Sequence, residues 1–97
     1  MRDIHFMERI TMEKPEIENR IFGILCRIYD VDPNAGQVSI EDIRRDFYLD
    51  SANAVALVME IQMEFGFEVA DEDVNDEMLS SFDSVCEYVS KKVAKGR

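Results

Sequence analysis

Residues 46–70 read DFYLDSANAVALVMEIQMEFGFEVA and predict a long helix that begins at Ser51. Asp50 is a strong N-cap residue, because its carboxylate can accept hydrogen bonds from the free backbone N–H groups of a first helical turn. Ser51 then takes the first helical position, and its hydroxyl points outward. A phosphate attached to that hydroxyl would lie in the positive field of the helix N-terminus. The segment therefore presents a serine and does not bury it.

The predicted helix has two apolar faces, which separate when its residues are placed about 100° apart. The first face consists of Ala54, Leu57, Val58, Ile61 and Phe65. The second consists of Ala52, Val55, Ala56, Met59 and Met63, and Glu60 and Glu64 lie along one edge between the two. One face must form core. The other either packs against the short segment that follows or stays exposed beside Ser51 as a docking strip.

The sequence before this helix is also helical in its periodicity. Residues 15–29 carry one apolar stripe, which ends at a run of polar residues, proline and glycine. Further along, Ser39 and Asp42 have the spacing of a capping box and predict a short helix. Ile43 and Phe47 would anchor that short helix on the bundle.

The sequence after it predicts one short element and one long helix. Residues 71–77 are short and acidic, with Val74 and Met78 as apolar anchors. Ser80 or Ser81 can then cap a last helix. Its apolar stripe consists of Phe82, Val85, Cys86, Val89 and Val93.

These elements together predict an all-α bundle with three longer helices and one or two short ones. A chain of 97 residues is one domain, with a modest core and no room for a deep, enclosed active site. We expect an N-terminal extension over residues 1–14, ahead of Pro15, and the helical domain over residues 15–97.

The charge of the chain excludes one class of partner and favours another. The formal net charge is −10, which argues against nucleic-acid binding, because that needs a basic surface. Residues 41–87 contain 14 Asp and Glu against two Arg, a net charge of −12. This concentration predicts partners with basic surfaces. The alternative is a solvated surface that keeps a small protein in solution.

The two cysteines, Cys26 and Cys86, are too few and too far apart for a metal site or a disulfide framework. Cys86 falls on the stripe of the last helix and should be a core residue, whereas Cys26 falls off its stripe and should be partly exposed. The sequence has neither a signal peptide nor an apolar run long enough to span a membrane. A reducing, cytoplasmic location without membrane insertion is expected.

At its central helix the sequence resembles the acyl carrier protein family, whose mark is Asp-Ser-Leu at the start of the second helix. Here the triplet is Asp50-Ser51-Ala52. Residues 46–49 look like the family's Asp-Leu-Gly-Ala lead-in, and residues 55–72 look like its helix and acidic third segment. The resemblance covers residues 15–93, so residues 15–97 are expected to form a carrier domain.

The resemblance implies that 4'-phosphopantetheine is esterified to Ser51 by a phosphopantetheinyl transferase that uses coenzyme A and Mg²⁺. The carrier then holds acyl groups as thioesters for acyl-transferring or synthase enzymes of fatty acid, polyketide or related specialised synthesis. It is not itself an enzyme, and it has no catalytic residue and no resident metal. In the family this helix contacts partner enzymes with basic docking patches. The docking residues that the resemblance implies for a monomeric carrier are Val55, Ala56, Met59, Glu60, Met63 and Glu64.

Several positions depart from the family pattern. Ala52 replaces the usual leucine, Tyr48 a usual glycine and Ala70 a usual proline. The attachment dipeptide itself is intact. We therefore expect a specialised carrier whose partners differ from those of general fatty acid synthesis.

Two other functions remain open at the level of sequence. Residues 30–42 look like a calcium-binding EF-hand loop, but a count of twelve from Asp30 puts Ala35 where glycine is needed. An Asx-rich polar turn is the simpler interpretation of this loop. The second alternative is a helical adaptor whose exposed apolar face binds a partner helix, with Ser51 incidental.

Overall fold

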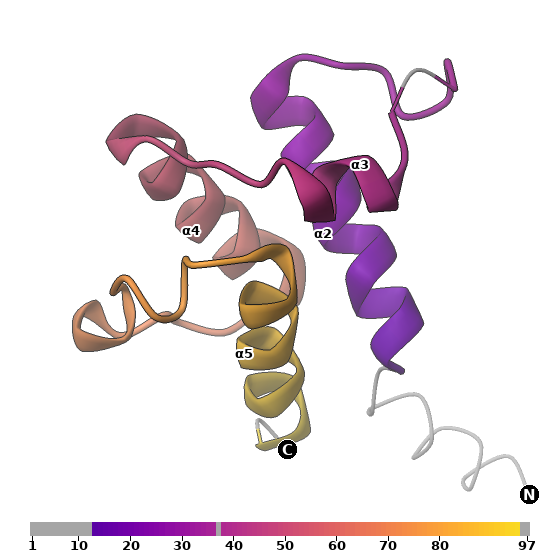
Figure 1. Ribbon diagram of the computed structural model, residues 1–97. Coiled ribbons are helices and arrows are strands. Elements are labelled where there is room, and N and C mark those ends of the chain that lie inside the picture. The colour runs from indigo at the N-terminus through magenta and orange to yellow at the C-terminus, as the bar shows by residue number, and fades with distance from the viewer. Residues whose placement is uncertain (1–12, 37, 96–97) are drawn as a thin grey trace, which may run out of the picture.

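The computed structural model describes residues 13–36 and 38–95, and every regular element in these ranges is helical (Figure 1). The elements are α2 (Lys14–Tyr29), α3 (Ile40–Arg45), α4 (Ser51–Phe65), the 3-10 helix η1 (Asp71–Asp73) and α5 (Phe82–Lys95). The predicted all-α bundle of three longer helices and one or two short ones is confirmed, with α3 and η1 as the short elements. Residues 1–12 of the expected N-terminal extension, which spans residues 1–14, lie outside the described residues.

Helix α2 is the element around which the others pack. It contacts α3, α4 and α5, and Figure 1 shows α4 and α5 to the left of α2. Pro15 lies in its first turn, where a missing N–H group removes no hydrogen bond. Asp30 ends the helix in a left-handed conformation with φ 61°, and its N–H donates back to the carbonyl groups of Arg27 and Cys26.

One contiguous apolar core lies between these helices. It is formed by the predicted stripes of α2 and α5, by one face of α4, and by single residues of the short segments. The buried members are Ile17, Ile21, Ile24, Leu25, Ile43, Leu57, Ile61, Val69, Met78, Phe82, Val85, Cys86 and Val89. The α4 face that contains Leu57 and Ile61 is therefore the core face.

The short segments are held by local hydrogen bonds and a few apolar anchors. The predicted capping box is present: the Ser39 hydroxyl accepts from the Asp42 N–H, and the Asp42 carboxylate accepts from the Ser39 N–H. Ile43 is buried and Phe47 packs against the core, as expected. At the start of α5, Ser81 and not Ser80 is the cap, because its hydroxyl accepts from the Ser84 N–H.

The segment after η1 has one of its two predicted anchors. Met78 is buried, but Val74 is 37% exposed, so the expectation for Val74 was wrong. Asn75 explains the difference, since its side-chain oxygen accepts from the Met78 N–H and its amide donates to the Glu72 carbonyl. This polar turn directs Met78 inward and leaves Val74 at the surface.

The prediction for Cys26 was also wrong. Cys86 is buried as expected, but Cys26 is fully buried too, although it lies beside the predicted stripe. Helix α2 is contacted by three other helices, and the chain folds back at its C-terminal end, where the Val31 N–H donates to the Cys26 carbonyl. A single stripe therefore underestimates how much of α2 is covered.

We expect both thiols to resist alkylation in the folded protein at pH 8. Burial raises the pKa of Cys86 to about 12 from 9.0, and burial followed by the charge of Asp32 raises the pKa of Cys26. For Cys86 this lowers the reactive thiolate fraction roughly a thousandfold. Because the pKa of Cys86 is higher in the folded than in the unfolded protein, its protonated thiol stabilises the folded state. This contribution to the free energy of unfolding is complete below pH 9 and is lost as the pH rises toward 12. Mass spectrometry of iodoacetamide labelling, with and without urea, measures the difference. Fast labelling of Cys26 in the folded protein would contradict its burial.

Candidate functional site

Ser51 is the first residue of α4, and it is exposed. The Asp50 carboxylate accepts a hydrogen bond from the Asn53 N–H at 2.8 Å, and the Asp50 carbonyl accepts from the Ala54 N–H, also at 2.8 Å. The cap predicted for Asp50 and the exposed position of Ser51 are confirmed. Ala52 is exposed next to them. The modification of Ser51 stays a prediction.

The segment that leads to Ser51 is fastened to the bundle. The Tyr29 hydroxyl donates to the Tyr48 carbonyl, which ties this segment to the end of α2. Arg45 donates two hydrogen bonds to the Asp46 carboxylate, and these bonds lower the pKa of Asp46. Tyr48 is 69% exposed and lies only three residues before Ser51. Tyr48 is not among the predicted docking residues, although its replacement of a usual glycine was a signal.

The second apolar face of α4 is largely exposed, and its role in docking stays a prediction. Val55, Met59 and Met63 are 59%, 56% and 72% exposed. Together with Ser51 they repeat every four residues, so they follow one another along one side of the helix. Ala56 is only partly exposed. We call Val55, Met59 and Met63 the α4 strip.

The two glutamates that were expected to contact partners, Glu60 and Glu64, each form an ion pair with an arginine of the same molecule. Arg27 donates to Glu60 at 2.9 Å, and Arg20 donates to Glu64 at 3.0 Å. Both arginines belong to α2, so these ion pairs bridge the two helices along the edge of the α4 strip. A docking role for Glu60 and Glu64 stays a prediction, but each carboxylate already has a cationic partner.

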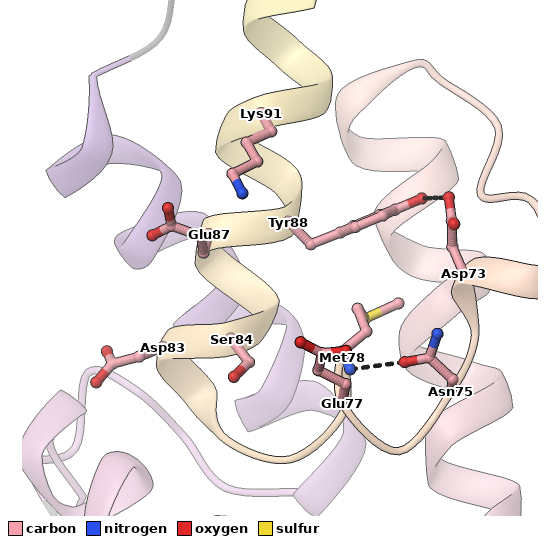
Figure 2. A pocket seen from close by; sticks show the side chains of 9 residues that line it. All are labelled: Asp73, Asn75, Glu77, Met78, Asp83, Ser84, Glu87, Tyr88 and Lys91. Carbon is pink, nitrogen blue, oxygen red and sulfur yellow. Dashed lines mark hydrogen bonds between the residues drawn. The ribbon is translucent and has the colours of Figure 1, made fainter.

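A hollow of about 450 Å³ lies elsewhere, between α5 and the turn after η1 (Figure 2). Four acidic side chains, Tyr88 and Lys91 are among the residues that line it, and no residue of α4 does. The Tyr88 hydroxyl donates to Asp73 at 2.8 Å, as Figure 2 shows, and this bond links η1 to α5. Burial, followed by Asp73, raises the pKa of Tyr88 to about 12, so the hydroxyl stays protonated. The hollow contains none of the predicted site residues.

The acidic residues of the loop that resembles a calcium site have other structural roles. Asp30 is the C-cap of α2, Asp32 accepts from the Asn34 N–H at 2.9 Å, and Asp42 belongs to the capping box. Among the described residues, which leave out Gln37, no three His, Cys, Asp or Glu side chains gather as a metal site requires. The Asp32–Asn34 bond is the polar turn that the sequence favoured.

We expect Asp50→Ala to lower the free energy of unfolding by about 1 kcal/mol, because the Asn53 N–H loses its side-chain partner. Asp50→Asn is the matched control, since asparagine caps helices about as well as aspartate. Urea unfolding followed by circular dichroism measures both variants. An alanine variant as stable as the original protein would show that this cap does not hold α4.

Within the described ranges, no helix is both long and apolar enough to cross a bilayer.

The sequence of the chain is similar to known proteins. Residues 19–89, which include Ser51, match the family described as the phosphopantetheine attachment site. An acyl carrier protein of Thermosynechococcus vestitus (strain NIES-2133 / IAM M-273 / BP-1) is 31% identical over 83 residues, which are 86% of this chain and 99% of that protein.

A second relative is more distant. Acyl carrier protein 2, mitochondrial, of Arabidopsis thaliana is 27% identical over 79 residues, which are 81% of this chain and 60% of that protein. No solved structure is significantly similar to the chain. The family match covers most of the chain and the whole of the capped α4 helix. The chain therefore belongs to the acyl carrier protein family, whose members carry acyl groups on covalently attached 4'-phosphopantetheine and are carriers, not enzymes.

Proposed function

We propose that Ser51 is the residue to which 4'-phosphopantetheine is attached. The observation that carries this proposal is an exposed hydroxyl at the first position of α4, directly after the Asp50 cap. The first-turn N–H groups lack acceptors within the helix and give this end a partial positive charge. A phosphodiester on Ser51 is favoured there, because both its charge and its oxygens match the helix end.

The attachment step belongs to a separate transferase that holds Mg²⁺ and coenzyme A. The Ser51 oxygen forms a bond to the phosphorus on the pantetheine side of the coenzyme A diphosphate. The bond from that phosphorus to the bridging oxygen breaks, and adenosine 3',5'-bisphosphate leaves. The hydroxyl proton passes to a base of the transferase, because the sequence offers no histidine near Ser51. Once attached, the arm supplies a terminal thiol for thioester chemistry.

The partners that we propose are this transferase and acyl-transferring or synthase enzymes of fatty acid, polyketide or related specialised synthesis. The net charge of −12 over residues 41–87 supports basic surfaces on these enzymes, because opposite charge speeds the approach of two proteins. Tyr48 and Ala52, next to Ser51, support a specialised carrier, since side chains beside the attachment residue face any enzyme that reaches it. The carrier is proposed to act as a monomer.

We further propose that the protein works in the cytoplasm. Cys26 and Cys86 are free and buried, which suits a reducing compartment. Mitochondria are the alternative location, because the name of the Arabidopsis relative places that protein there. Cell fractionation distinguishes the two locations. Recovery of the protein in the mitochondrial fraction would overturn the cytoplasmic location.

The attachment proposal is tested by weighing the protein after incubation with coenzyme A, Mg²⁺ and a promiscuous phosphopantetheinyl transferase. A gain of one phosphopantetheinyl group, mapped to Ser51 by peptide fragmentation, is the expected result. A protein that gains no mass, both in this reaction and in its native cell, would favour the helical adaptor.

A further inference from the structure

We propose that the transferase that loads Ser51 holds this carrier through an apolar groove that receives the α4 strip, and not through basic residues that pair with α4. This inference rests on the proposed attachment at Ser51. It concerns how the partner recognises the site, which the family match does not specify. Three observations carry it: the exposure of the strip, the charges of α4, and the position of the strip relative to Ser51.

The charged residues of α4 already have partners within the molecule. Glu60 and Glu64 are the only charged residues in its sequence. Each is bonded to an arginine of α2, at 2.9 Å for Arg27–Glu60 and 3.0 Å for Arg20–Glu64. A basic group on a partner would therefore meet carboxylates whose charge these arginines already balance in part. At short range, the glutamates of α4 therefore attract a basic partner less strongly than unpaired carboxylates would.

The side of α4 that continues from Ser51 is exposed and apolar instead. Val55, Met59 and Met63 are each more than half exposed, which is unusual for three large apolar side chains in a row on one helix. Burial of such side chains is the main favourable term when proteins associate. Methionine also adapts its shape to different grooves, because its side chain is unbranched and flexible.

The strip lies within reach of any enzyme that acts on Ser51. At a rise of 1.5 Å per residue, Val55 is about 6 Å and Met59 about 12 Å along the helix axis from Ser51. An interface of standard size covers roughly 800 Å² on each partner. A transferase whose active site receives the Ser51 hydroxyl therefore covers at least the first two residues of the strip. If that surface were polar, Val55 and Met59 would be buried against it without an apolar partner.

The test measures the steady-state loading of the full chain by a promiscuous phosphopantetheinyl transferase with coenzyme A. For Met59→Gln/Met63→Gln we expect the KM for the carrier to rise about tenfold, equivalent to ~1.4 kcal/mol, with kcat nearly unchanged. For Glu60→Gln/Glu64→Gln we expect a rise of less than about twofold, because exposed ion pairs contribute little. Both pairs are surface substitutions, and circular dichroism confirms that each variant is folded.

A third variant, Arg20→Gln/Arg27→Gln, frees both glutamates without touching the strip. Its KM should become more sensitive to salt than that of the original protein, because α4 then carries two unpaired charges. A large effect of the glutamate pair, or no effect of the methionine pair, would overturn the apolar groove. In either case the original protein is still loaded, so the proposed function survives. If the original protein is not loaded at all, the proposed function fails, and this inference fails with it.

Discussion

Ser51→Ala should abolish the attachment of phosphopantetheine completely, because the substitution removes the only oxygen that the proposed chemistry uses. The fold should not change. Ser51 is exposed, and the Asp50 cap bonds to Asn53 and not to the Ser51 side chain. A substitution at such a surface position changes the free energy of unfolding by about 0.5 kcal/mol or less. Loss of loading without loss of stability would therefore separate a chemical role from a structural one.

The matched control is Ser80→Ala. Ser80 is also an exposed serine near the start of a helix, but the cap of α5 is Ser81. Intact mass after incubation with coenzyme A and transferase should show full loading of the Ser80 variant and none of the Ser51 variant. Thermal unfolding of both variants shows whether each is folded. A Ser51→Ala protein that still gained the full mass would place the attachment elsewhere and refute the assignment of Ser51.

Leu57→Ala should lower the free energy of unfolding by about 2–5 kcal/mol, because it leaves a cavity in the core between α2 and α4. A domain of this size has a total stability of about 5–15 kcal/mol, so the loss is large. Met59→Ala, two residues further along the same helix, should change it by about 0.5 kcal/mol or less, since Met59 is 56% exposed. The contrast tests which of the two apolar faces of α4 is core.

Urea unfolding followed by circular dichroism measures this pair, with the midpoint and slope fitted for each variant. A smaller slope for the Leu57 variant would indicate that its native state had loosened. Equal losses at the two positions would mean that both faces are buried in solution. That result would also remove the exposed strip on which the apolar docking groove depends.

The candidate site was predicted closely where its geometry is local. Asp50 caps α4 through a bond to a residue three positions away, and Ser39 and Asp42 bond to each other over the same separation. Such contacts lie within one helical turn, so residue type and spacing suffice to predict them. The exposure of Ser51 follows from the same geometry, because the first turn of a capped helix faces outward at its N-terminus.

The environment of the site was not predicted, because it depends on residues far apart in the sequence. Glu60 pairs with Arg27 and Glu64 with Arg20, which are 33 and 44 positions away. The spacing of charges along one helix cannot show that a neighbouring helix neutralises them. The burial of Cys26 was missed for a similar reason, since it depends on how many helices contact α2.

The sequence by itself determined that α4 begins at Ser51, that Asp50 caps it, and that α4 has two apolar faces. Only the tertiary structure decided which face is buried, because either face satisfies the helix equally well in isolation. Packing on α2 selects the face with Leu57 and Ile61, and the segment after α4 leaves the opposite face uncovered. Burial depends on what lies across from a residue, and periodicity within one helix carries no information about that.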